Sequence, residues 1–151
     1  MKVDIDLIRR GEGPLVLWVS RHGPLPAEIE ELERVLKDPH IVKISGKIPN
    51  AEWLTAIVSN MRKTPVGWKR PIIIVPVLPL SMIKYIVEAF RDAKGIEVWW
   101  TDMETIGYSK EEPDVNPHDT VKLYDGTRWR VMRFKRFERI KEVRIVTEPV
   151  G

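Results

Sequence analysis

In residues 15–36 a continuously apolar stretch is followed by an amphipathic one. Of all the features of the sequence, this one most strongly restricts the possible fold. Residues 15–19 read Leu-Val-Leu-Trp-Val, as expected of a strand that is covered on both faces. After a short polar turn, Pro26 suits the first turn of a helix, in which apolar residues recur at helical spacing from Ile29 to Leu36. A buried strand followed directly by such a helix is typical of an open α/β sheet.

The alternation of strand and helix continues as far as residue 100. The predicted strands are residues 41–44, 72–75 and 96–100, and the predicted helices lie around residues 53–61 and 81–90. Residues 72–75 are β-branched throughout, which favours a strand, and Ser81 suits the N-cap of the helix that follows. The order from residue 15 is therefore β-α-β-α-β-α-β, which predicts a Rossmann-like parallel sheet with flanking helices.

The pattern changes near the C-terminus. Residues 101–119 are polar and are predicted to form a long loop. C-terminal antiparallel β strands are predicted at residues 120–124, 128–137 and 142–147, and Asp125-Gly126 gives the strongest hairpin signal. A half-exposed strand is also predicted at residues 3–7, where apolar and polar residues alternate.

The fold class expected is thus α/β, a Rossmann-like parallel sheet with flanking helices plus the C-terminal antiparallel strands. A length of 151 residues favours a single domain, 1–151. Within it we expect a Rossmann-like core over residues 15–100 and a basic β appendage over residues 118–151.

The composition indicates a cytoplasmic protein. The absence of Cys excludes a disulfide framework, a thiolate zinc site and a Cys nucleophile. The chain begins with acidic residues, unlike a signal peptide, and its longest apolar run, residues 71–80, is about half the length needed to span a bilayer. We expect no membrane association. The many Ile, Val, Lys, Glu and Arg residues hint at a thermophilic source.

Positive charge gathers near the C-terminus. The formal net charge is +3, but residues 117–151 carry nine Lys or Arg against five Asp or Glu. Residues 1–116 carry sixteen against seventeen. This asymmetry indicates either an anionic partner at the C-terminal end or simply a solvated strand face.

Three strand ends carry polar residues that are predicted to meet at one edge of the sheet. Ser20, Arg21 and His22 follow the first core strand, Lys47 follows the second, and Ser81 lies after the third. Arg and Lys bind phosphate, a hydroxyl at a helix N-terminus adds to an anion site, and His titrates near neutrality and can act as a general acid. The alternatives are that Arg21 and His22 only meet solvent and that Ser81 is a plain helix cap.

The sequence lacks the motifs of several common enzyme and cofactor-binding classes. The chain has no G-x-G-x-x-G, no Walker loop and no G-x-S-x-G, and its three His residues lack metal-ligand spacing. We therefore expect no cofactor and no metal. Asp102 and Glu104 are interpreted as part of a solvated loop, with Mg²⁺ binding as the alternative. Glu28, Glu30 and Glu31 argue against a phosphate directly on the first helix, since they already satisfy its dipole.

A second candidate surface interleaves cations with aromatic rings. Its residues are Arg128, Trp129, Arg130, Arg133, Lys135 and Arg136. Such a strand can bind phosphates through its cations and stack bases on its rings. The alternative is an edge strand that charge protects from aggregation.

Two short segments carry a family resemblance. Trp18-Val19-Ser20-Arg21-His22 and Val77-Leu78-Pro79-Leu80 resemble small stand-alone CRISPR-associated proteins with a CARF-like domain, a CRISPR-associated Rossmann fold. Some of these antiviral defence proteins are ring nucleases. The resemblance covers roughly residues 15–100, and the basic C-terminal strands have no counterpart in it.

The resemblance implies a homodimer that binds a cyclic oligoadenylate, or another nucleotide or RNA ligand, across its two-fold axis. It also implies metal-independent cleavage, in which a ribose 2′-hydroxyl attacks the adjacent phosphate. Arg21 would then stabilise the developing charge and His22 would be the acid. Ser20 and Ser81 would position the ligand, and Lys47 would contact a phosphate.

Two alternatives come from other functional classes. The chain is either a non-catalytic nucleic-acid-binding protein that uses the C-terminal basic-aromatic strands, or an interaction protein of a mobile element. The second follows from the six Trp residues, since Trp68, Trp99 or Trp100 would suit a protein interface if exposed.

Overall fold

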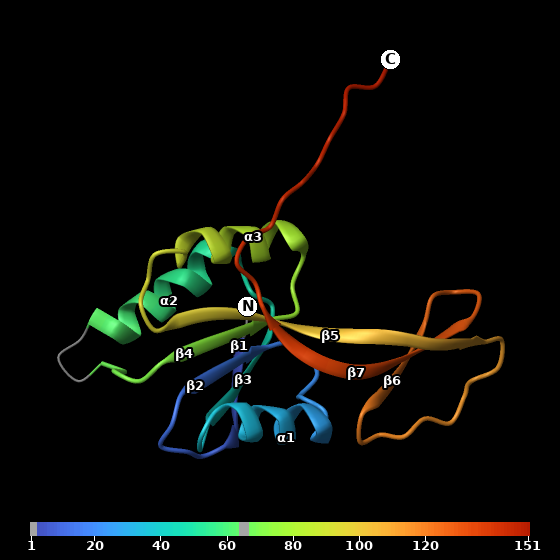
Figure 1. Ribbon diagram of the computed structural model, residues 1–151, viewed down its shortest axis with the longest axis horizontal. Coiled ribbons are helices and arrows are strands. Elements are labelled where there is room, and N and C mark those ends of the chain that lie inside the picture. The colour runs from blue at the N-terminus through green and yellow to red at the C-terminus, as the bar shows by residue number, and fades with distance from the viewer. Residues whose placement is uncertain (1–2, 64–66) are drawn as a thin grey trace.

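The computed structural model describes residues 3–63 and 67–151, and these form a mixed α/β fold with one curled sheet and helices on both of its faces (Figure 1). The strands are β1 (Val3–Arg9), β2 (Leu15–Val19), β3 (His40–Gly46), β4 (Ile72–Pro76), β5 (Ile96–Ser109), β6 (Thr120–Tyr124) and β7 (Trp129–Arg139). The helices are α1 (Pro26–Val35), α2 (Ala51–Lys63) and α3 (Leu80–Ala89).

The sheet order is β1-β3-β2-β4-β5-β7-β6. The four strands β3, β2, β4 and β5 run parallel, with Val16 of β2 opposite Ile41 of β3 and Ile73 of β4. Strand β1 is antiparallel to β3, and β7 is antiparallel to both β5 and β6. The predicted alternation of strands and helices from residue 15, and the parallel direction of these strands, are confirmed.

The hydrophobic core lies on both faces of β2 and β4, which are buried along their whole length. On one face, Leu17 and Ile74 belong to the same cluster as Leu54 of α2 and Ile86 of α3. On the other face, Trp18 packs in a cluster with Leu32 of α1. Figure 1 shows α2 and α3 on one side of the sheet and α1 on the other. Each fully buried aliphatic side chain contributes about 1.5–3 kcal/mol, so this two-sided burial anchors the parallel strands.

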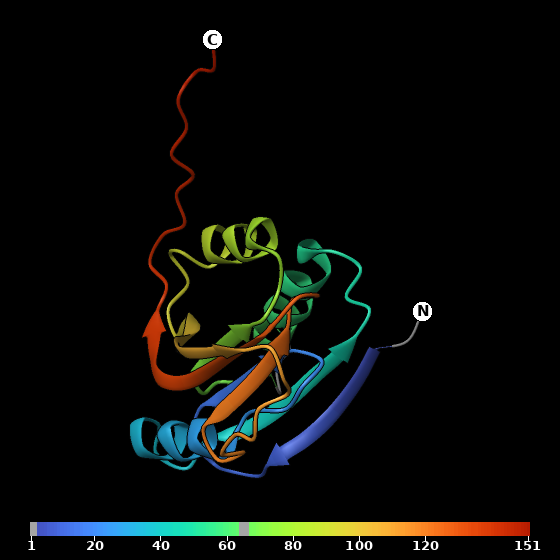
Figure 2. The same cartoon turned by 90° about the vertical axis from the view of Figure 1, so that its right-hand side faces the viewer.

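Strand β5 corrects the prediction of a long loop over residues 101–119. The strand continues to Ser109, and β7 pairs with it from Trp99 opposite Arg139 to Ser109 opposite Trp129. The polar composition of this stretch is tolerated because β7 supplies its backbone hydrogen bonds while much of the stretch stays exposed. Figure 2 shows the β5–β7–β6 strands from their end.

The hairpin between β6 and β7 forms where Asp125-Gly126 predicted it. The Asp125 carboxylate accepts hydrogen bonds from the N–H groups of Arg128 and Thr127, each at 2.9 Å. These two bonds, with a third from the Thr127 hydroxyl, lower the pKa of Asp125 to about 2. Gly126 has a φ of 99°, which only glycine adopts readily. The turn is therefore held by its own short-range chemistry.

The predicted strand at residues 142–147 is wrong. Ile140 donates its N–H to the carbonyl of Val98, and Ile140 and Val143 pack against the core. The remaining tail has no strand structure and runs away from the sheet in both views (Figures 1 and 2). An apolar pattern is not enough for a strand when no sheet edge pairs with it.

Candidate functional site

The carboxyl ends of three parallel strands enclose a depression of about 340 Å³ beside the start of α3. We call it the strand-edge pocket. Ser20 and Arg21 reach it from the end of β2, Ser45 and Lys47 from the end of β3, and residues 77–79 from the loop after β4. The structure thus brings together three of the residues that the sequence predicted to meet, Ser20, Arg21 and Lys47.

The charge of this pocket is positive. Arg21 and Lys47 are both exposed, and within residues 3–63 and 67–151 neither of them forms an ion pair. By contrast, Arg9 is held by Asp38 at 2.8 Å and Lys43 lies 4.0 Å from Asp6. As far as the described residues go, the pocket lining includes no acidic side chain. Two uncompensated cations beside two Ser hydroxyls are suited to bind an anion with several oxygen atoms.

A local hydrogen-bond network fixes the loop that carries Arg21. The Ser20 hydroxyl oxygen accepts from the N–H of His22 at 3.2 Å, and the Trp18 indole N–H donates to the carbonyl of His22 at 3.0 Å. The Ser20 N–H donates to the Ile44 carbonyl at 3.1 Å. Two side chains, those of Ser20 and Trp18, and the neighbouring strand β3 therefore hold the backbone where the chain leaves β2.

His22 does not line the strand-edge pocket, which separates it from Arg21. It lines a larger depression of about 500 Å³, which we call the hairpin groove. The groove lies between the end of β2, the start of α1 and the strands β5, β6 and β7; its lining includes Trp18, Glu28, Met103, Leu123 and Met132. Ser20 and Val77 line both depressions. Arg21 and His22 therefore line two different depressions that have Ser20 and Val77 in common, and their action on one ligand stays a prediction.

A buried carboxyl group lies in the wall of the hairpin groove. Glu28 is 4% exposed, and its two oxygen atoms accept from the Leu25 N–H at 2.8 Å and from the Thr101 hydroxyl at 2.7 Å. Burial raises the pKa of Glu28, and these two hydrogen bonds offset part of that effect. The position of Glu28 in the first turn was visible in the sequence, but its burial was not, because Thr101 is 73 residues away.

Ser81 is neither the N-cap of α3 nor part of the strand-edge pocket. The N-cap is Pro79, whose carbonyl accepts the first helical hydrogen bonds, from Met82 at 3.0 Å and Ile83 at 3.1 Å. Helix α3 therefore begins at Leu80, and Ser81 is exposed in its first turn. The second hydroxyl group in the pocket, beside that of Ser20, belongs to Ser45. In the sequence, only its position two residues before Lys47 indicated this.

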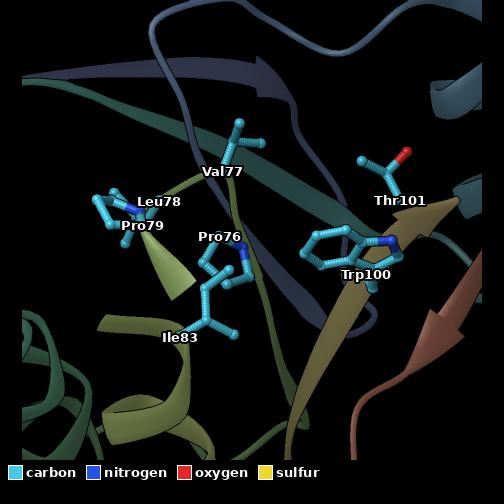
Figure 3. Close-up of a pocket in the computed structure, with 7 residues that line it drawn as sticks. All are labelled: Pro76, Val77, Leu78, Pro79, Ile83, Trp100 and Thr101. Carbon is cyan, nitrogen blue, oxygen red and sulfur yellow. The ribbon is translucent and has the colours of Figure 1, made fainter. Parts of the chain in front are cut away.

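A third depression of about 420 Å³ lies on the other side of the loop after β4, and we call it the Trp100 pocket (Figure 3). Its lining consists of residues 76–79, Ile83 of α3, and Trp100 and Thr101 of β5. Figure 3 shows the Trp100 ring next to Pro76. Of the three Trp residues considered for an interface, Trp100 is exposed and Trp68 and Trp99 are half-buried.

The cations of the basic C-terminal segment are mostly engaged within the sheet. Arg133 pairs with Glu104 at 2.7 Å and lowers the pKa of that carboxyl, and Arg136 lies 3.7 Å from Asp102. Asp102 and Glu104 therefore lie on β5 as partners of β7, not in a solvated loop. Nucleic-acid binding by this segment stays a prediction.

The remaining members of the segment also have neighbours. Arg128 lies 3.8 Å from Asp125 and stacks 3.7 Å from the centre of the Tyr108 ring, and the Arg130 guanidinium donates to Thr105 at 2.8 Å. Trp129 packs against Tyr124. Lys135 is close enough to Glu104 to help lower its pKa. The positive charges of Arg128 and Lys135 are thus offset by nearby acids, whereas Arg130 is held by a neutral hydroxyl group.

Among residues 3–63 and 67–151, no group of three or more His, Cys, Asp or Glu side chains is placed to hold a metal ion. No helix in those ranges combines the length and apolar character needed to cross a membrane. No family model matches the chain, and neither do any of the curated proteins or solved structures with which it was compared.

Proposed function

We propose that the chain binds a phosphodiester ligand of the nucleotide class in the strand-edge pocket. The family resemblance indicates a cyclic oligoadenylate. The observation that carries the proposal is the convergence of Arg21 and Lys47, which come from separate loops and form no ion pair with any other described residue. A charge-assisted hydrogen bond contributes about 1.5–3 kcal/mol, so two such groups supply useful affinity for a phosphate.

The strand order supports this location. Helix α1 follows β2 on one face, and α3 follows the adjacent strand β4 on the other face (Figure 1). Loops after neighbouring parallel strands then diverge, and ligands of open α/β sheets bind at such a point. This arrangement also favours the Rossmann-like description that we propose for residues 15–100.

Cleavage of the ligand is an extension of this proposal. In the reaction that the resemblance implies, a ribose 2′-hydroxyl gives up its proton to water and its oxygen forms a bond to phosphorus. The bond from phosphorus to the 5′-oxygen breaks, and the 5′-oxygen takes up a proton. Arg21, which lines the strand-edge pocket, would stabilise charge on the phosphate. His22 faces the hairpin groove, so it can donate the proton only to a ligand that lies across Ser20. In a homodimer, two copies of the pocket would face a symmetric ligand.

The test is a thermal-shift and cleavage screen with cyclic tri-, tetra- and hexa-adenylate. A ligand that binds only the folded state raises the melting temperature by mass action. We expect at least one of these rings to stabilise the wild-type protein, with affinity falling at least about tenfold in Arg21→Ala or Lys47→Ala, because each loses a charged hydrogen-bond donor.

Arg10→Ala and Lys69→Ala are matched controls. Both residues are exposed and lie at the opposite edge of the sheet, next to the ends of β1 and β4 that are far from the pocket. These variants should bind as the wild type does. Equal ligand-induced shifts in the wild type and in Arg21→Ala contradict the proposal. A response to linear RNA alone that is lost in Arg130→Ala and Arg133→Ala would instead assign the function to β7.

A further inference from the structure

The Trp100 pocket shares one wall with the strand-edge pocket. Val77, Leu78 and Pro79 line both depressions, so the loop after β4 forms a ridge between them. Val77 is 53% exposed at this ridge. A ligand bound beside Arg21 and Lys47 therefore has an apolar pocket as its direct neighbour on the other side of a short loop.

Trp100 offers this pocket an accessible aromatic ring. Ile96 and Val98, on the same face of β5, are buried in the core under α3, but Trp100 is 44% exposed at the end of that row. In the part of the chain that the structure describes, Trp100 pairs with no other aromatic ring and its indole N–H has no hydrogen-bond partner. A large apolar ring facing an open pocket is suited to stack on a flat heterocycle.

The hairpin groove also borders the strand-edge pocket, but its chemistry is less suitable. Its wall includes the Glu28 carboxyl group, and only Ser20 and Val77 are shared. The described lining of the Trp100 pocket holds no charged side chain at all (Figure 3). A nucleotide contains an anionic phosphate and a flat base with largely apolar faces. The phosphate matches the strand-edge pocket and the base matches the Trp100 pocket, and residues 77–79 line both pockets.

We propose that the Trp100 pocket is a nucleobase subsite, in which the base stacks on Trp100 while its phosphate lies in the strand-edge pocket. This inference rests on the proposed function. It adds a binding site for the base, which contributes affinity that does not depend on the charge of the phosphate. Aromatic stacking depends on the flat face of a base and not on its hydrogen-bonding edge, so it tolerates different bases.

The test compares two probes by isothermal titration calorimetry: cyclic tetra-adenylate and an abasic ribose-phosphate strand with the same number of phosphates. Trp100→Ala should lower the affinity for tetra-adenylate about tenfold and leave the affinity for the abasic strand unchanged. Trp100→Phe keeps a stacking ring and should restore most of the lost affinity. Tyr85→Ala, which removes an exposed ring of α3 that lines none of the three depressions, should bind as the wild type does.

The outcomes separate the two proposals. If Trp100→Ala binds tetra-adenylate as the wild type does while Arg21→Ala does not, the base subsite is wrong and the phosphate site stands. If Trp100→Ala weakens both probes equally, the ring supports the pocket wall and the base subsite is again wrong. If the wild type binds neither the abasic strand nor any of cyclic tri-, tetra- and hexa-adenylate, both proposals fail.

Discussion

Glu28 shows at the scale of one residue how a single carboxyl group joins two distant parts of the chain. One of its oxygen atoms satisfies the backbone at the start of α1, and the other accepts from Thr101 in the middle of β5. Its burial opposes ionisation, and this raises the pKa. The folded protein therefore takes up a proton on Glu28 at higher pH than the unfolded chain does.

The consequence is a dependence of stability on pH. Stability from this protonation is present below the ordinary pKa of Glu and is lost as pH rises through the raised value in the folded state. Glu28→Gln cannot ionise, yet its amide can accept from Leu25 and donate to the Thr101 oxygen. We expect the melting temperature of Glu28→Gln, relative to the wild type, to increase between about pH 4 and pH 8.

Thermal melts over that pH range measure this difference. Glu28→Ala is the comparison, since it also cannot ionise but leaves the Leu25 N–H without its acceptor, and it should be about 1 kcal/mol less stable than Glu28→Gln at every pH. A constant difference between Glu28→Gln and the wild type across the range would show that Glu28 has the same proton affinity in both states.

The residues of the candidate site differ in how far the sequence predicts them. Arg21 and Lys47 lie just after β2 and β3, so their placement at one sheet edge follows from the parallel topology. The separation of His22 from Arg21 does not, because it depends on which way each side chain points after a turn held by Trp18. The exposure of Trp100 depends on where α3 stops covering β5, which no local sequence pattern predicts.

At the scale of elements, two loops at the amino edge of the sheet fit together closely. The loop between β1 and β2 passes against the loop between α1 and β3, and Gly13 donates its N–H to the Asp38 carbonyl at 2.7 Å. A Cβ atom on Gly13 would lie 2.0 Å from the Lys37 carbonyl oxygen, and one on Gly11 would lie 2.4 Å from that of Asp38. Both contacts are to backbone, which cannot rotate away.

Gly13→Ala should therefore be strongly destabilising, by about 2 kcal/mol or more, because the two loops must separate to accept a methyl group. Chemical denaturation of the purified variant measures this loss. Gly107→Ala is the matched control: no described atom lies within 4 Å of its added Cβ, and we expect a change within about 0.5 kcal/mol. Equal stability of the two variants would contradict the close approach of these loops.

Pairing partners explain which elements the sequence predicts poorly. Residues 101–109 lack a strong apolar row but form a strand, because β7 runs alongside and Arg133 and Arg136 face Glu104 and Asp102. Residues 142–147 have an apolar pattern, but no strand in the described part of the chain pairs with them. Strand formation in this region is decided by contacts across the sheet, and these are not encoded within the segment itself.

For the whole molecule, the C-terminal tail divides into a packed part and an unpacked part. Ile140 and Val143 contact the core, whereas Ile145, Val146 and Val150 are 65%, 92% and 101% exposed. The tail beyond Arg144 therefore adds little to the folding free energy.

Deleting residues 145–151 should leave the melting temperature unchanged, and deleting residues 140–151 should lower it by several degrees, since the longer deletion removes two packed side chains and a backbone hydrogen bond to Val98. Differential scanning calorimetry of both truncated chains distinguishes the two effects. A large loss from the shorter deletion would mean that the exposed tail makes contacts in solution.

The apolar strands and their order along the chain predict the parallel half of the sheet. The antiparallel half is harder to predict from the sequence. β5 explains why the two halves cannot be treated separately: its first residues pair in parallel with β4, and its whole outer stretch pairs with β7. Genetic recombination that replaced only the segment after residue 110 would pair β5 with a strand whose sequence does not match it. For such an exchange to give a folded protein, the outer half of β5 has to be inherited together with the β6–β7 hairpin.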